Sequence, residues 1–68
     1  MTALGNSIRQ KREKAGISQE AAARQVGVSL VTWGRWERGE IDVPSSRIPE
    51  IAEALGTSPS ALWAEIPA

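Results

Sequence analysis

The feature that most restricts the fold of this chain is a connection of only three residues, Gly27, Val28 and Ser29. A stretch with helical character ends just before it, near Val26, and another begins just after it, at Leu30. Three residues that begin with glycine favour a tight corner between two helices over an antiparallel hairpin. Val28 is apolar and can fill the space beneath that corner. The spacing therefore predicts a helix-turn-helix arrangement.

Glycine and serine mark the ends of the other helical stretches in the same way. A glycine suited to a left-handed cap follows four of them, at Gly16, Gly27, Gly39 and Gly56. A serine that can cap the next helix stands at Ser18, Ser29, Ser46 and Ser58. We therefore predict five helices, at about 3–15, 19–26, 30–38, 47–55 and 59–64, a loop at 40–46 and no strand. The expected fold is a single all-α domain over residues 1–68.

Composition limits the chemistry that such a domain can perform. The 68 residues include no cysteine, so the chain has no thiol nucleophile and no thiolate metal ligand. They also include no histidine, the commonest general base and transition-metal ligand. One pair of carboxylates, Glu50 and Glu53, is better explained as a solvated helix face. We therefore expect no enzyme activity, no metal and no cofactor. The chain leaves no room for a sensor domain, so we expect no small-molecule ligand. The absence of a long apolar run or signal peptide indicates a cytoplasmic protein without a membrane partner.

Charge is distributed unevenly along the chain, although the net charge is zero. Residues 1–38 carry seven basic and three acidic side chains, a balance of +4, while residues 39–68 carry one and five, a balance of −4. A partner that contacts only the first half would meet a positive surface, as a polyanion requires. A chance division of charge in a short chain would give the same pattern.

The helix expected at 30–38 has two different sides. At about 100° per residue, Trp33 and Trp36 lie together, while Leu30, Val31, Gly34, Arg35 and Arg38 lie on the opposite side. Tryptophans at helical spacing are far more often core residues than base-stacking platforms, so we expect Trp33 and Trp36 to anchor the helix. The core should also include Leu4, Ile8, Ala15, Ile17, Ala22, Ala23, Val26, Ile48, Ile51, Ala52, Leu55 and Leu62.

The side that faces away from the core has the chemistry of a DNA reader. Leucine and valine can contact thymine methyl groups, and an arginine can bind the N7 and O6 atoms of guanine. Gly34 costs the helix about 1 kcal/mol relative to alanine. Close approach of the helix to DNA would explain that glycine, and so would simple sequence drift.

With these residues in place, the chain resembles the phage-repressor and Cro type of helix-turn-helix domain, the XRE family. The matching segments are IRQKREKAGISQEAAARQVGVS, WERG and IPEIAEALGTSPSALW, within about residues 4–64. The resemblance implies a five-helix, lambda-repressor-like DNA-binding domain. It also implies that the helix at 30–38 enters the major groove of double-stranded DNA, as part of a homodimer on a near-palindromic operator.

The resemblance assigns roles to individual positions. Those matching base-reading residues are Ser29, Leu30, Val31 and Arg35, and those matching DNA-backbone contacts are Gln19, Thr32, Arg38 and Arg47. The side-chain amide of Gln19 could also reach a base edge. Arg12 and Glu37 match an internal ion pair between the first and third helices. Helical spacing supports that pair, because Arg12 lies one turn beyond Ile8 on the same face.

Three departures from the family pattern affect these assignments. Ala22 replaces the usual leucine and Trp33 the usual small aliphatic residue, and we expect the indole to fill the volume that Ala22 leaves empty. Leu30 and Val31 replace polar residues, so specificity would depend more on Arg35, thymine methyls and DNA shape. The acidic segment EIDV, residues 40–43, removes phosphate contacts and should weaken nonspecific affinity.

Two functions remain open from the sequence. The first is a transcriptional regulator, a repressor or autoregulator, acting in the cytoplasm of a prokaryotic or phage-type system at the nucleoid. The second is a protein-interaction module on the same scaffold, such as an antitoxin-like protein that binds a partner through Leu30 and Val31. We expect Trp63 and Ile66, apolar residues with little core left to join, to lie in a dimer interface.

Overall fold

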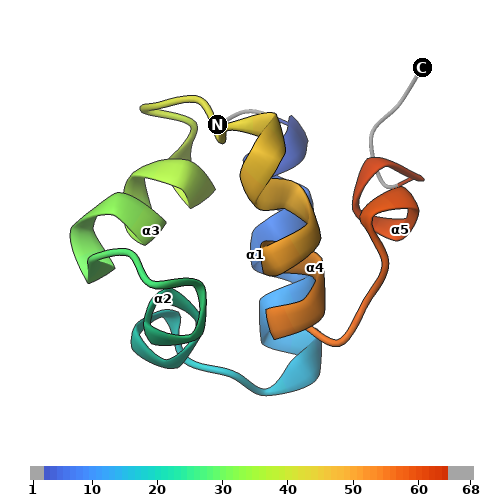
Figure 1. Ribbon diagram of the computed structural model, residues 1–68, viewed down its shortest axis with the longest axis horizontal. Helices are drawn as coiled ribbons and strands as arrows, with labels where there is room; N and C mark the ends of the chain where they lie inside the picture. Colours follow the sequence, from blue (N-terminus) through green and yellow to red (C-terminus); the bar gives the residue numbers. More distant parts are fainter. Residues whose placement is uncertain (1–2, 65–68) are drawn as a thin grey trace.

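The computed structural model describes residues 3–64 of the chain, and within this range it consists of helices joined by short turns (Figure 1). The α-helices are α1 (Ala3–Ala15), α2 (Gln19–Val26), α3 (Leu30–Arg38), α4 (Ile48–Ala54) and α5 (Pro59–Ala64). A short 3₁₀ turn, Ser45–Arg47, leads into α4. The predicted all-α class and the number of helices are confirmed for the described residues. The fourth helix is shorter than the predicted range 47–55 at both ends, because Arg47 belongs to the 3₁₀ turn and Leu55 is the residue that caps the helix.

The predicted helix ends are formed largely as expected. All four glycines that follow a helix have positive φ angles, where a side chain would strain the backbone. Ser18 and Ser58 accept hydrogen bonds from the amides of Ala21 and Ala61, at 3.0 and 3.1 Å. The prediction that Ser46 caps the fourth helix is wrong. Because α4 continues directly from the 3₁₀ turn, it begins without a side-chain cap.

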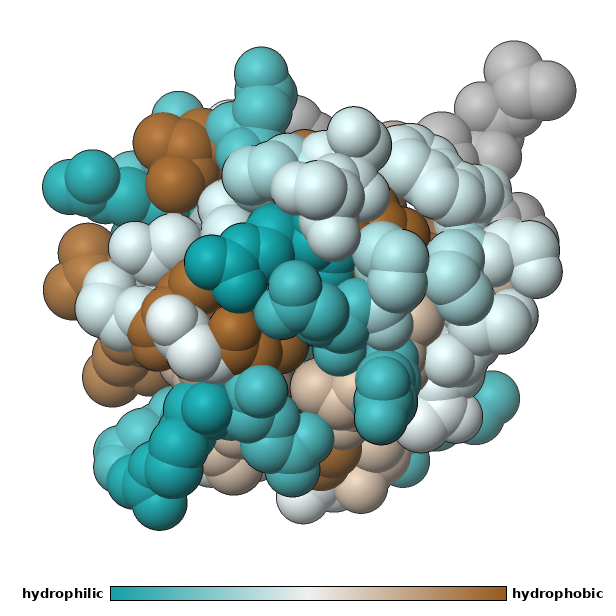
Figure 2. Space-filling model, in the orientation of Figure 1, coloured by the Kyte–Doolittle hydropathy of each residue, from teal (hydrophilic) through white to brown (hydrophobic). Residues whose placement is uncertain are grey.

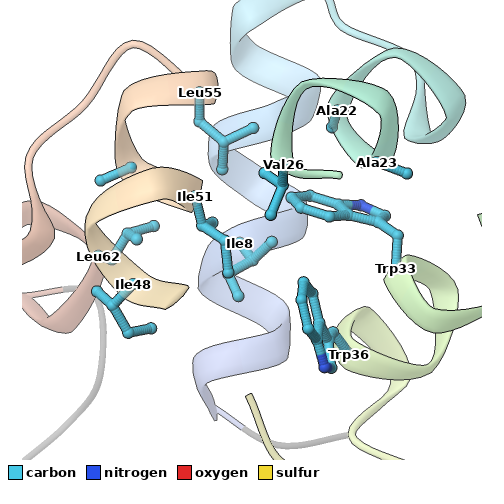
Figure 3. Packing of buried hydrophobic residues seen from close by; sticks show 11 residues of the cluster. Ile8, Ala22, Ala23, Val26, Trp33, Trp36, Ile48, Ile51, Leu55 and Leu62 are labelled. Carbon is cyan, nitrogen blue, oxygen red and sulfur yellow. The ribbon is translucent and has the colours of Figure 1, made fainter. Parts of the chain in front are cut away.

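The helices pack around one core with α2 and α3 on one side and α5 on the other (Figure 1). Helix α1 contacts α3 and α5, and α2 contacts α3 and α4. The core brings together the residues Ile8, Ala22, Ala23, Val26, Trp33, Trp36, Ile48, Ile51, Ala52, Leu55 and Leu62 (Figure 3). Ala15 was expected in the core but is exposed, because the last turn of α1 extends beyond the core.

Two large indoles fill the part of the core beneath α2. Trp33 and Ala22 are both completely buried, and the Trp33 indole extends from α3 toward Val26 (Figure 3). The expectation that a large residue on α3 fills the space left by a small one on α2 agrees with this arrangement. Trp36 packs edge-on to Trp33, with ring centroids 5.9 Å apart and an interplanar angle of 60°. Together they fix α3 to the rest of the domain.

Candidate nucleic-acid interface

The corner between α2 and α3 sets the direction in which α3 projects. Gly27 has φ 81°, and its amide donates to the carbonyl of Ala23 over 2.9 Å. Val28 is partly buried against the core. The Ser29 hydroxyl accepts a hydrogen bond from the Thr32 amide at 3.1 Å and donates to the Thr32 hydroxyl at 3.0 Å. Gly27 caps the end of α2 and Ser29 caps the start of α3, so hydrogen bonds fix the backbone on both sides of the corner.

The inner side of α3 carries a buried carboxylate, Glu37, which is only 1% exposed. Arg12 of α1 donates to it from Nε at 2.6 Å, and Gln19 of α2 donates from Nε2 at 2.9 Å. Trp33, one turn earlier on α3, donates from its indole nitrogen at 2.6 Å. Arg12 also reaches the carbonyl of Ile17 at 2.8 Å. One carboxylate therefore joins the first three helices, and the predicted partners Arg12 and Glu37 are in direct contact.

These hydrogen bonds determine the charge state of Glu37. Burial raises the pKa of a carboxyl group, because it removes the charged form from water. At Glu37 the hydrogen bonds from Arg12, Gln19 and Trp33, together with the charge of Arg12, outweigh that effect and hold the pKa below its ordinary value. Glu37 is therefore an anion at neutral pH, as the arginine beside it requires.

Part of this network was missed by the sequence reasoning. Gln19 was assigned to DNA through the family resemblance, yet its amide nitrogen is bonded to Glu37. Trp33 was treated as a purely apolar anchor. The spacing of Trp33 and Glu37, four residues apart on one helix, was the available signal, because such residues are neighbours on a helix surface. No comparable spacing links Gln19 to α3, so that contact required the structure.

The outer side of α3 is open to solvent. Leu30 is 48% exposed and Val31 is 61% exposed, and the two apolar side chains are adjacent on this side of the helix. Arg35 is exposed beside them and forms no ion pair with any residue in the range 3–64. Figure 2 shows hydrophobic side chains over α3 interspersed with hydrophilic ones. The side of α3 predicted to read bases is thus not covered by the described part of the chain.

Arg38, at the end of α3, is paired rather than free. Its Nε contacts the carboxylate of Glu40, and both side chains are about half exposed. Its guanidinium lies over Gly34, which is buried, and a Cβ at residue 34 would stand 3.0 Å from Arg38 Nη1. The guanidinium of Arg38 thus lies close against the helix backbone at Gly34, a contact that the sequence analysis did not predict.

Arg47 is partly occupied in holding the scaffold together. Its Nη1 donates to the carbonyl of Val26 at 3.0 Å, at the end of α2, and to Glu50 at 3.1 Å. Cations at a helix C-terminus are favourable because the last carbonyls lack partners. The side chain remains 37% exposed. Arg47 thus fastens the start of α4 to the corner that precedes α3.

Of the two residues expected in a dimer interface, only Trp63 lies within the described chain. Trp63 of α5 is 49% exposed, although its neighbour Leu62 is fully buried and accepts a 2.7 Å hydrogen bond from Ser7 through its carbonyl. Ile66 lies outside the described residues. In residues 3–64, no helix is long and apolar enough to cross a membrane, and no cluster of metal-ligating side chains occurs.

A short helix projected from a glycine corner, with one side anchored and the other open, defines the helix-turn-helix class of domain. A family model described as a helix-turn-helix domain matches residues 3–64. The chain belongs to this family and is of its phage-repressor (XRE) type.

Individual relatives support this placement. Repressor protein C2 of Salmonella phage P22 is 37% identical over 59 residues, which cover 87% of this chain and 27% of the repressor. The crystal structure of the clp gene regulator ClgR from C. glutamicum matches with a TM-score of 0.89 and 30% identity, over 93% of this chain and 82% of that one. The P22 c2 repressor in complex with a synthetic operator matches with a TM-score of 0.79 and 35% identity, over 91% and 94% of the two chains. The chain spans less than half the length of the curated relatives that it matches.

Proposed function

We propose that this chain is a sequence-specific binder of double-stranded DNA that regulates transcription, with α3 in the major groove. The observation that carries the proposal is the exposure of Leu30, Val31 and Arg35 along one side of a helix whose other side is fixed to the core. A major groove admits an α-helix, and a rigid helix can present side chains to base edges in a defined register. The P22 c2 repressor, similar over almost the whole chain, was solved in complex with a synthetic operator.

In this proposal, Ser29, Leu30, Val31 and Arg35 read the bases. Arg35 donates to the N7 and O6 atoms of a guanine, because an unpaired guanidinium matches that pair of acceptors. Leu30 and Val31 contact thymine methyl groups. This reading surface offers few hydrogen-bond donors, so sequence-dependent DNA shape contributes to specificity as well.

The DNA backbone is contacted by Gln19, Thr32, Arg38 and Arg47. In the free protein each of these side chains has fewer groups available to bind phosphate, because part of the side chain already has a partner within the domain. Gln19 keeps one amide hydrogen, and Arg47 keeps the donors other than Nη1. Few phosphate contacts are therefore expected, and a moderate dependence of affinity on salt follows.

The functional form is a homodimer on a near-palindromic operator, acting as a repressor or autoregulator in the cytoplasm at the nucleoid. Two copies of α3 would enter successive major grooves about 34 Å apart. The exposed Trp63, together with Ile66, contributes the interface between the copies. Replacing Trp63 by aspartate should shift sedimentation equilibrium toward the monomer, and an unchanged association constant would contradict this interface.

Selection of bound sites from random duplex DNA tests the proposed function most directly. We expect an enriched site with twofold symmetry, half-sites one helical turn apart and an affinity that falls as salt rises, because phosphate contacts release counterions. Failure to enrich any sequence, with affinity independent of salt, would contradict DNA recognition. That outcome would favour a protein partner docked on the apolar pair Leu30 and Val31, which the zero net charge also permits.

A further inference from the structure

The residues that follow α3 bring an acidic side chain back beside the helix. Gly39 has φ 73°, and its amide donates to the carbonyl of Trp36 at 3.2 Å. The next amide, that of Glu40, donates to the carbonyl of Arg35 at 2.9 Å. This is the backbone pattern of a glycine-terminated helix, which reverses the chain within two residues. The position of Glu40 next to the last turn of α3 is therefore set by the backbone.

Arg38 is held by Glu40 on one side and by the helix surface on the other. Its Nε contacts the Glu40 carboxylate, while its guanidinium covers Gly34. A Cβ at position 34 would stand 3.0 Å from Arg38 Nη1, so the guanidinium lies close against the helix backbone there. The hydrogen bond from Arg38, and then the charges of Arg38 and Arg35, lower the pKa of Glu40. The carboxylate is therefore charged at neutral pH.

We propose that Glu40 competes with DNA phosphate for Arg38 and thereby lowers the affinity of α3 for DNA of any sequence. This proposal rests on the proposed function, since it concerns how strongly the same surface binds DNA. A carboxylate and a phosphate are both anionic acceptors for the fork of donors on arginine, so the two contacts use the same donors.

The exposed position of the pair makes this competition possible. The Arg38 and Glu40 side chains are 54% and 51% exposed, and ion pairs at such sites contribute little free energy. The buried pair of Arg12 and Glu37 is different, because the two side chains are only 12% and 2% exposed. A phosphate can therefore displace Glu40 from Arg38 but cannot reach Arg12. Glu40 adjusts affinity, whereas Glu37 maintains the fold.

The experiment measures the affinity of four variants for a mixed-sequence duplex two helical turns long, by fluorescence anisotropy at fixed moderate salt. Glu40→Gln should bind about two- to fivefold more tightly than the wild type, the range that an exposed ion pair contributes. Glu53→Gln, which removes the same charge from an exposed position on α4, is the matched control and should change affinity less.

Two further variants show whether Glu40 acts through Arg38. Arg38→Gln should weaken binding, and adding Glu40→Gln to it should give no more than the small gain of the Glu53→Gln control. A full gain in the double variant would overturn the proposal, because Glu40 would then repel phosphate directly. Equal affinities of Glu40→Gln and Glu53→Gln would also overturn it.

The outcome for the wild type separates this proposal from the proposed function. The affinity of the wild type is therefore also measured over a series of salt concentrations. Wild-type binding that weakens with salt, without a gain in Glu40→Gln, overturns only the role of Glu40. A wild type that binds no duplex DNA even at low salt overturns both. Thermal unfolding of each variant checks that the domain is intact, and substitutions at exposed positions should leave it within about 0.5 kcal/mol.

Discussion

The inner and outer sides of α3 differ in exposure and in hydrogen bonding, although they share one helix backbone. On the inner side Trp33, Trp36 and Glu37 are at most 3% exposed, and two of them are joined by a hydrogen bond. On the outer side Leu30 and Val31 are about half exposed or more, although both are apolar. Burial of apolar area explains the inner side. It does not explain the outer side, where Leu30 and Val31 lie exposed on the same helix side as Arg35, an arginine without an ion pair in residues 3–64.

The comparison also shows what the buried carboxylate adds to apolar packing. Two indoles in a core can be accommodated in more than one orientation, since apolar contacts are not directional. Glu37 receives donors from α1, α2 and α3, and these hydrogen bonds are directional. We infer that the tryptophans hold α3 to the domain while Glu37 fixes its rotation. That rotation determines which side chains face outward.

The largest expected effect lies on the inner side. Trp33→Ala should lower the free energy of unfolding by about 3–5 kcal/mol, because it removes a fully buried indole and leaves a cavity. In a helix-turn-helix domain that covers residues 3–64, that is a large part of the total stability. Leu30→Ala is the control on the outer side of the same helix and should change stability by less than about 0.5 kcal/mol. Denaturant unfolding of both variants measures the contrast, and equal losses would remove the distinction between the two sides.

The second expected effect concerns the charge of Glu37. Glu37→Gln should lower the free energy of unfolding by about 2–3 kcal/mol at neutral pH, because it leaves Arg12 partly buried without its counterion. The folded-state pKa of Glu37 lies below the ordinary value of 4.5. The stabilisation is therefore complete above about pH 4.5 and disappears as the pH falls through the folded-state pKa. The difference between wild type and variant should shrink on acidification.

Unfolding curves recorded from neutral pH down into the acid range measure this difference. The matched control is Glu53→Gln on α4, which replaces an exposed carboxyl and should change the free energy of unfolding by less than about 0.5 kcal/mol. A difference for Glu37→Gln that stays constant from neutral pH into the acid range would show that the pKa of Glu37 is the same in the folded and unfolded states, and a difference that grows on acidification would show that folding raises it.

The fold was predictable because local signals and core pattern agree. Glycines with positive φ and serine caps determine where helices end, and both can be recognised from residue type alone. The start of α4 was mispredicted, because a 3₁₀ turn and an α-helix share similar backbone angles and Ser46 resembles a cap. Helical periodicity also separated the tryptophans from Leu30 and Val31.

The candidate site was less predictable, because its polar contacts connect residues distant in sequence. Gln19 and Glu37 are 18 positions apart, and Arg47 bonds a carbonyl 21 positions away. No helical spacing relates such residues, since their approach depends on how whole helices pack. The resemblance to known repressors found Arg12 and Glu37 but assigned Gln19 and Arg47 to DNA alone. Their bonds within the domain became visible only in three dimensions.

The third prediction concerns a residue on the outer side of α3, where we expect a loss of DNA affinity and not of stability. Arg35→Ala should reduce binding to the selected operator by about 1–3 kcal/mol and relax the preference at one base pair. Its effect on unfolding should be small, because the side chain is exposed and unpaired within residues 3–64. Equilibrium binding to the operator and to its single-base variants measures the loss of affinity and the change in base preference. A uniform loss across all sequences would show that Arg35 contacts phosphate.

The smallest expected effect lies where the two sides of α3 meet. Ser29 caps the helix through the Thr32 amide and is also a proposed base reader. Ser29→Ala should lower the free energy of unfolding by about 1 kcal/mol, the usual contribution of an N-cap. Ser46→Ala is the control, because no cap bond is lost there.

A second substitution separates the two roles of Ser29. Asparagine is as good an N-cap as serine, so Ser29→Asn should keep the stability of the wild type. Its longer amide side chain presents different donors and acceptors to a base edge, so the preferred bases next to it should change. Selection of bound sites with this variant measures that change. An unchanged site together with unchanged stability would mean that Ser29 belongs to the scaffold and that base reading begins at Leu30.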